Sequence, residues 1–261
     1  MKKVVLLFTI LNLFFVSNAF AQEAPLPALR QACETGNAKS CAYLAYLYSE
    51  GKRVKEDPKI GLGYLEKACS SGLQSACYMS GKILYWGRKV KQDVKRGDTL
   101  MKGACEKGEM DACEVLGKIA ESGLYCKQDY KLARTYFEKA CENKHASGCN
   151  ELGVLYGRGR GVKNDDVFAA KLYDKSCKLG NVLGCANFGF RLTLGRGVKQ
   201  DIPSGLKYLN ESCEANDTSG CKYLADFYEK KGDKVSQKKA EMFFEKACKL
   251  GNKKACLKTK K

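Results

Sequence analysis

The sequence predicts an all-α protein, a right-handed superhelix (solenoid) of antiparallel helix pairs in which a disulfide closes each hairpin. Three observations support this: a 36-residue repeat, one cysteine pair in each repeat, and an apolar stripe of helical spacing after each pair. A segment typical of an export signal precedes the repeats, so the cysteines would meet an oxidising compartment. Units of this size bury their apolar faces only by stacking, which makes a solenoid.

The cysteines define the repeat. Seven pairs have seven residues between their members, and successive pairs start 36 residues apart except the last, which starts 35 residues after its predecessor. The pairs are Cys33 with Cys41, Cys69 with Cys77, Cys105 with Cys113, Cys141 with Cys149, Cys177 with Cys185, Cys213 with Cys221, and Cys248 with Cys256. This spacing spans a helix end, a turn and the next helix start, so the two sulfurs should face each other and bond locally.

Each repeat carries signals for two helices. The first helix ends after the first cysteine, because the glycine three residues later, such as Gly72, suits a left-handed C-cap. The second helix starts near the second cysteine and has apolar residues at i, i+3, i+4 and i+7. In one repeat these are Cys149, Leu152, Gly153 and Tyr156. An Asp in the following loop, such as Asp165, can cap the next helix.

The stripe contains a column of small residues, which indicates close packing between helices. Its members are Ala45, Gly81, Gly117, Gly153, Gly189 and Ala225. A glycine inside a helix costs about 0.5 to 1 kcal/mol relative to alanine, so a column of glycines needs a packing reason. We expect six full helix pairs, with a lone helix before them around residues 26–35 and a short capping helix after them.

Residues 1–21 have the pattern of a signal peptide. Lys2 and Lys3 precede an apolar run over residues 4–16, and Ala19 and Ala21 mark a cleavage site. The run has about 13 residues, too few to cross a bilayer core. We therefore expect residues 22–261 to form a single repeat domain without a membrane anchor, in the periplasm or secreted from the cell.

The charge of the chain favours acidic partners. Leaving out Lys2 and Lys3, 44 basic residues stand against 29 acidic ones, a net charge of +15. Such a surplus suits an acidic peptide, protein or glycan, although a lysine-rich solvated exterior explains it too. No nucleic-acid recognition motif is present in an exported chain, so nucleic acid is not an expected partner. We expect a monomer.

Neither a metal nor another cofactor is expected. Zinc sites favour two to four residues between cysteine ligands and often include histidine, whereas the spacing here is seven and His145 is the only histidine. His145 is interpreted as a turn residue. Cys126 lies outside the pairs and aligns with loop valines such as Val54, so it is predicted to be a buried free thiol, with an intermolecular disulfide as the alternative.

Three motifs resemble those of a known family. They are the Ala-Cys-x-x-Gly-x-x-x-x-Cys hairpin, the Leu-Gly-x-x-Tyr helix at residues 152–156 and the Gly-x-Gly-Val-x-x-Asp loop at residues 159–165. Over residues 26–257 the chain resembles Sel-one-like, tetratricopeptide-like repeats, and among them the Helicobacter cysteine-rich proteins. Lys144 and Asn216 replace the hairpin glycine, and the loop after Gly232 is short. The resemblance implies secretion and penicillin binding or weak β-lactam hydrolysis.

Whether the protein is an enzyme stays open at this point. A metal β-lactamase needs several histidines, and a serine enzyme needs Ser-x-x-Lys with Ser-Asp-Asn and Lys-Thr-Gly partner motifs, which are missing. Ser-x-x-Lys occurs four times where composition predicts about two by chance. Ser219 and Lys222, near a helix start, are the best catalytic candidates.

The competing hypothesis is a binding platform on the concave face of the solenoid. Positions that flank the apolar stripe vary between repeats, as expected either for ligand contacts or for merely solvated positions. The candidates are Tyr46, Tyr78, Lys82, Tyr85, Trp86, Glu114, Lys118, Asn150, Arg158, Phe190, Lys222 and Asp226. Aromatic residues beside lysines suit an anionic peptide, carboxylate or glycan. The family resemblance adds a β-lactam or a peptidoglycan fragment as possible ligands.

One further motif indicates modification. Glu214-Ala-Asn216-Asp-Thr218 is similar to the acidic sequon of bacterial N-glycosylation, in an exposed hairpin. The alternative is that Asn216 serves only as a helix C-cap.

Overall fold

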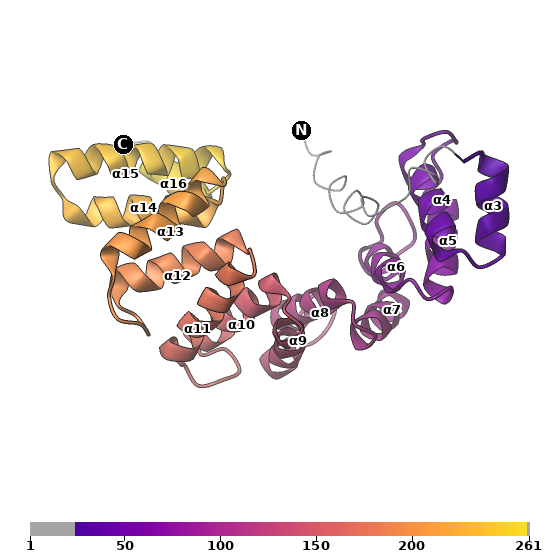
Figure 1. The fold of residues 1–261 in the computed structure, drawn as a ribbon, viewed down its shortest axis with the longest axis horizontal. Coiled ribbons are helices and arrows are strands. Elements are labelled where there is room, and N and C mark those ends of the chain that lie inside the picture. The colour runs from indigo at the N-terminus through magenta and orange to yellow at the C-terminus, as the bar shows by residue number, and fades with distance from the viewer. Residues whose placement is uncertain (1–23, 260–261) are drawn as a thin grey trace. The chain divides into compact units, whose positions relative to one another are not determined.

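The computed structural model describes residues 24–259, in which every regular element is an α-helix, and the helices pair into hairpins along the chain (Figure 1). The helices are α3 (Leu26–Glu34), α4 (Ala38–Glu50), α5 (Pro58–Ser70), α6 (Gln74–Trp86), α7 (Val94–Glu106), α8 (Met110–Ser122), α9 (Tyr130–Glu142), α10 (Ala146–Arg158), α11 (Asp166–Lys178), α12 (Val182–Leu194), α13 (Ile202–Glu214), α14 (Thr218–Lys231), α15 (Lys234–Lys249) and α16 (Lys253–Lys258). The predicted all-α hairpin fold is confirmed. No helix among the described residues has both the length and the apolar character needed to span a membrane.

The chain divides into two compact units. Unit 1 extends to Leu116 and unit 2 starts at Gly117, so α8 contributes to both. The expectation that residues 22–261 form one domain stays a prediction. The predicted signal peptide, residues 1–21, lies outside the described residues.

Aspartates start the odd-numbered helices from α5 to α15. The capping residues are Asp57, Asp93, Asp129, Asp165, Asp201 and Asp233. At α11 the Asp165 carboxylate accepts a hydrogen bond of 2.8 Å from the backbone N–H of Phe168. A cap of this kind contributes about 1 kcal/mol by satisfying an N–H that has no partner within the helix.

Disulfides close the seven hairpins at the pairs predicted from spacing. The S–S distances range from 1.97 to 2.06 Å and the Cα–Cα distances from 4.4 to 4.9 Å. The residue three positions after each first cysteine has a positive φ, which is between +91° and +97° at the glycines and +60° and +61° at Lys144 and Asn216. The chain therefore leaves each odd-numbered helix through a left-handed residue and returns at once. Seven disulfides fit an oxidising compartment outside the cytoplasm.

Cys126 is unbonded, as predicted, but it is exposed, so the prediction of a buried thiol is wrong. It lies in the loop between α8 and α9, where the equivalent Val54 and Val162 are half-buried. Its Sγ lies 3.8 Å from the backbone carbonyl oxygen of Ile119 in α8. Alignment with a half-buried valine column therefore overestimated the burial of Cys126.

The small column allows close contact between the helices of neighbouring hairpins. A Cβ on Gly153 of α10 would lie 2.8 Å from the Tyr173 ring of α11, closer than packed atoms approach. In unit 2 this contact brings the even-numbered helices α10, α12 and α14 into successive layers, as Figure 1 shows. These three helices carry the candidate site.

Candidate ligand-binding face

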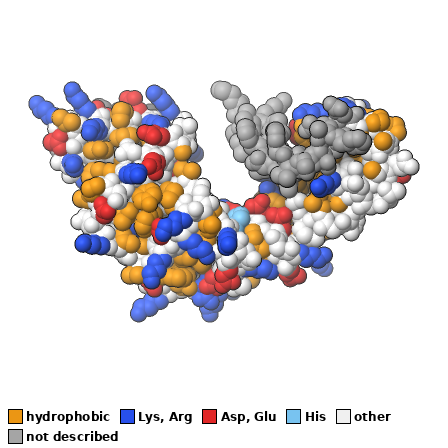
Figure 2. All heavy atoms as spheres, viewed as in Figure 1, with side chains coloured by type: hydrophobic (Ala, Val, Ile, Leu, Met, Phe, Trp, Pro, Cys, Tyr) orange, Lys and Arg blue, Asp and Glu red, His pale blue; other side chains and the backbone are white. Residues whose placement is uncertain are grey.

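Helices α10, α12 and α14 present side chains that interact with one another across three repeats. Figure 2 shows hydrophobic side chains beside lysine and arginine side chains over this part of unit 2. We call this surface the unit 2 face. It consists of Asn150, Arg158, Asn187, Phe190, Lys222, Tyr223 and Asp226.

Hydrogen bonds between side chains join the three helices of the unit 2 face. The Asn187 Nδ2 group donates to Asn150 Oδ1 at 2.8 Å, and the Tyr223 hydroxyl donates to Asn187 Oδ1 at 3.1 Å. Asn150 is only 1% exposed, whereas Asn187 and Tyr223 are half-buried. Burial raises the pKa of the Tyr223 phenol, so the hydroxyl keeps its proton and acts as a donor at neutral pH.

An aromatic pair covers the centre of the unit 2 face. The rings of Phe190 and Tyr223 are stacked with centroids 4.3 Å apart and planes inclined by 16°. Both side chains are half-buried, so part of each ring is open to solvent. A partly exposed aromatic pair of this kind offers apolar contact area with little loss of side-chain entropy on binding.

Arg158 supplies a positive charge without an ion partner. It is exposed and makes no salt bridge within residues 24–259. Its positive charge opposes the rise that burial causes in the pKa values of Tyr173 and Tyr223. Lys222, in contrast, is bonded to Asp226. Arg158 is therefore the cation of this face that is available to a carboxylate.

An ion pair with a buried arginine joins α11 and α12 in unit 2. Arg191 is 7% exposed, and its Nη1 lies 2.5 Å from Asp166 Oδ1, while Arg196 Nε lies 2.9 Å from the other carboxylate oxygen. A Cβ on Gly157 would lie 2.4 Å from Arg191 Nη2, so glycine there makes room for the guanidinium. The pair ties α12 and the loop after it to the start of α11.

Two residues predicted to contact ligand are buried instead. Tyr85 is 2% exposed, because α7 approaches it closely: a Cβ on Gly97 would lie 2.7 Å from its backbone nitrogen. Asn150 is enclosed by its bond to Asn187. The prediction of a direct ligand contact is wrong for both, and Asn150 acts by holding Asn187.

Sequence reasoning missed Asn187 and Tyr223. Each lies two positions after the second cysteine of its repeat, whereas the predicted residues lie one, five, eight or nine positions after it. Asn187 is three residues before Phe190, and Tyr223 is three residues before Asp226. Because residues three apart share one side of a helix, the predicted Phe190 and Asp226 could have indicated Asn187 and Tyr223. Of the predicted residues, Phe190, Lys222, Asp226 and Arg158 do meet on this face.

Unit 1 carries a separate group of the predicted residues. The Lys82 ammonium lies 4.8 Å from the centroid of the Tyr78 ring, and burial raises the pKa of Tyr78 and lowers that of Lys82. Trp86 is half-buried with its ring edge-on to Tyr85 at 5.0 Å. Of the remaining predicted residues, Glu114 and Tyr46 are half-buried in unit 1. In unit 2 the Lys118 Nζ atom lies 3.4 Å from Glu151 Oε1.

The catalytic candidates do not form a nucleophile with its base. The Lys222 ammonium is bonded to Asp226, and within residues 24–259 no hydrogen bond joins it to Ser219. A serine nucleophile needs a base within hydrogen-bond distance. This arrangement gives no support to β-lactam hydrolysis at Ser219.

His145 and Asn216 both occupy turn positions. His145 is the N-cap of α10, where its Nδ1 accepts a hydrogen bond of 3.1 Å from the backbone N–H of Gly148. Asn216 is exposed and left-handed, with φ of +61°, as a C-cap requires. Glycosylation of Asn216 stays a prediction.

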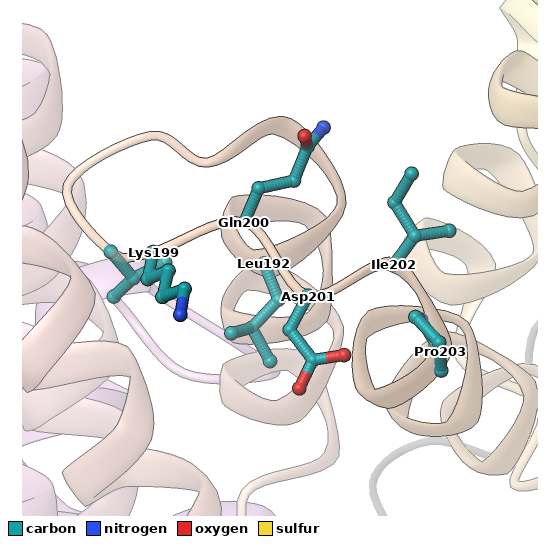
Figure 3. A pocket seen from close by; sticks show the side chains of 7 residues that line it. Leu192, Lys199, Gln200, Asp201, Ile202 and Pro203 are labelled. Carbon is teal, nitrogen blue, oxygen red and sulfur yellow. The ribbon is translucent and has the colours of Figure 1, made fainter.

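A shallow pocket of about 690 Å³ lies beside the loop between α12 and α13 (Figure 3). Its lining includes Leu192, Lys199, Gln200, Asp201 and Ile202. Two of its polar groups serve the fold, because Asp201 caps α13 and the Gln200 amide donates to the carbonyl of Thr193. The pocket therefore offers few free polar groups for recognising a ligand.

Comparisons with known proteins agree with this architecture. The Sel1 repeat model matches residues 38–73, 74–108, 111–145, 146–181, 183–217 and 219–252. A Sel1 repeat protein from Oxalobacter formigenes is 27% identical with a TM-score of 0.73, covering 82% of this chain and 89% of that one. A protective antigen of uropathogenic Escherichia coli is 25% identical with a TM-score of 0.62; the match covers 88% of this chain and 58% of that one.

A cysteine-rich protein B of Helicobacter pylori is 27% identical over 61% of this chain and 94% of that one, with a TM-score of 0.34. No curated protein sequence matches the chain. The six repeat matches extend over most of the described residues and establish the family of the chain. The chain belongs to the Sel1 repeat family.

Proposed function

We propose that the protein is an exported binding module whose unit 2 face holds an extended, acidic segment of a partner protein. The observation that carries this proposal is the joined surface of α10, α12 and α14, where the Asn187–Tyr223 hydrogen bond and the Phe190 stack adjoin the unpaired Arg158. Sel1 repeat proteins mediate protein–protein interactions, which fits this surface.

The dimensions of the face favour an extended peptide. Three helix layers about 10 Å apart span roughly 20 Å, which about six extended residues cover. Asn187 offers an amide near the middle of this span, and amide groups can bond to the main chain of a peptide. The stacked rings would contact an apolar side chain of the ligand, and Arg158 would pair with a carboxylate.

The compartment follows from the same chemistry. Seven local disulfides hold the hairpins, and such bonds persist in the periplasm or outside the cell. Together with the signal-like residues 1–21, this supports export, and the partner would be another protein of that compartment.

The test uses the oxidised protein and fluorescein-labelled peptides of about eight residues. One pool is rich in Asp, Glu and Tyr, and a matched pool carries Lys in place of the acids. We expect fluorescence anisotropy to show binding of the acidic pool only. Arg158→Ala should weaken it about 10-fold or more, since a charge-assisted hydrogen bond contributes about 1.5 to 3 kcal/mol.

Lys171→Ala is the matched control, because Lys171 is an exposed cation on α11, away from the unit 2 face. The Lys171→Ala variant should bind the acidic pool with the same affinity as the unchanged protein. Equal weakening by both substitutions would mean that net charge alone attracts the peptide. Failure of the acidic pool to bind at all would refute the proposal.

A further inference from the structure

The connection between α14 and α15 carries a dense group of positive charges. Five lysines lie within residues 230–239, all exposed: Lys230, Lys231, Lys234, Lys238 and Lys239. None of them makes a salt bridge within the described part of the chain. Asp233 is the acid of this stretch, and its carboxylate is occupied in capping α15, with 3.1 and 2.9 Å bonds from the N–H groups of Val235 and Ser236.

Two apolar side chains project from the same surface. Val235 is 66% exposed and Met242 is 55% exposed. Val235, Lys238, Lys239 and Met242 follow the spacing i, i+3, i+4 and i+7, so they lie on one side of α15. The opposite side of the helix is buried through Ala240, Phe244 and Ala247. We call the five lysines with Val235 and Met242 the basic corner.

The helix dipole bears on the lysines unequally. Lys234 is the first residue of α15, where the dipole disfavours a positive charge, whereas Lys238 and Lys239 lie beyond the first turn. Lys230 and Lys231 do complement the C-terminus of α14. The helix dipole therefore favours Lys230 and Lys231, and the Lys239 ammonium lies 5.1 Å from the centroid of the Tyr228 ring, whereas neither effect explains Lys234 and Lys238.

We infer that the basic corner docks the protein reversibly onto an anionic phospholipid surface. The lysines would lie among the head-group phosphates, and Val235 and Met242 would enter the boundary between head groups and acyl chains. A surface that is basic and apolar at once suits such a boundary, because it offers phosphate and hydrocarbon together. The exposed acids Glu241 and Glu245 lie further along α15, so the positive charge is concentrated at its N-terminal end.

The basic corner adjoins the unit 2 face. Asp226 of the face and Lys230 of the corner lie four residues apart, on one side of α14.

The experiment is co-sedimentation of the full, oxidised chain with vesicles of phosphatidylcholine, with and without phosphatidylglycerol. The test variant carries Lys234→Glu, Lys238→Glu and Lys239→Glu. Each lysine near an anionic surface contributes about 1 kcal/mol, so partitioning should fall at least 100-fold. The matched control carries Lys127→Glu, Lys163→Glu and Lys171→Glu, which replace three exposed lysines and change the net charge equally. Its fold-loss in partitioning should be about 10-fold smaller than that of the test variant.

Val235→Ser leaves the charge unchanged and should lower partitioning several-fold, because apolar insertion is lost. Circular dichroism of each variant should match that of the unchanged chain. Equal losses in the two triple variants would overturn the inference, as would equal binding to vesicles without phosphatidylglycerol. Complete displacement by an equal charge of soluble polyglutamate would also overturn it, since an acidic protein would then be the better partner.

Discussion

Replacing Asn187 by alanine tests the hydrogen bonds that join the unit 2 face. The substitution removes the 2.8 Å bond to Asn150 and the 3.1 Å bond from Tyr223. Because Asn150 is 1% exposed, its Oδ1 then has no ready access to water. The half-buried Tyr223 hydroxyl can turn toward solvent, so losing the bond from Tyr223 costs less stability than losing the bond to Asn150.

The expected cost follows from these two terms. A buried acceptor left without its donor costs about 1 to 3 kcal/mol, and a partly exposed bond contributes about 0.5 to 1 kcal/mol. We therefore expect Asn187→Ala to lower the free energy of unfolding by about 2 to 3 kcal/mol. In the double variant with Asn150→Ala the buried acceptor is gone as well, so the two costs should fall short of additivity by about 1 kcal/mol.

Urea unfolding of the oxidised protein followed by circular dichroism measures both quantities. Fluorescence would not serve, because Trp86 is the only tryptophan and lies in unit 1. Asn210→Ala is the control. Among the described residues its amide bonds only to the carbonyl of Leu206 in its own helix, so the substitution should cost less than about 0.5 kcal/mol. If Asn187→Ala costs no more than Asn210→Ala, or if the costs of Asn187→Ala and Asn150→Ala simply add, Asn187 does not join the helices in this way.

Three further predictions concern the fold. Replacing Cys177 and Cys185 by serine should lower stability by about 2.5 kcal/mol, the chain entropy of a loop of about nine residues, measurable as a shift in the urea midpoint. Maleimide labelling of the native oxidised chain should modify one site, Cys126, and Cys126→Ser should leave stability within about 0.5 kcal/mol. The pKa of Asp166 is held below its ordinary value of 3.8, first by the hydrogen bond from Arg196 and then by Arg191. This carboxylate therefore stabilises the folded chain above about pH 4, so the deficit of Asp166→Asn at pH 7 should shrink as pH falls through the folded pKa.

The sequence predicted the features that depend on neighbours along the chain. The hairpin disulfides, the left-handed residue at Asn216 and the Asp165 cap each involve groups fewer than ten residues apart, and the repeat shows each of them several times. Local geometry of this kind is set by a few backbone angles. The predicted and observed hairpins therefore agree.

The errors arise where contacts join different hairpins. Burial of Tyr85 depends on how closely Gly97 of the next helix approaches, and the role of Asn187 depends on partners about 36 residues away in both directions. A position in the aligned repeats predicts which side of a helix a residue occupies, but not how deeply that side is buried. Cys126 shows the same limit, since the aligned valines are half-buried and its own thiol is exposed.

The proposed function requires Asn187 to lie at the centre of a ligand-binding face, and the side-chain amide signals of asparagine in nitrogen-15 NMR report on this directly. On titration with the acidic peptide pool, the Asn187 amide resonances should shift in proportion to binding, while those of Asn210 on α13 stay in place. Shifts confined to Asn210, or saturable binding that leaves Asn187 unchanged, would contradict the assignment of the unit 2 face.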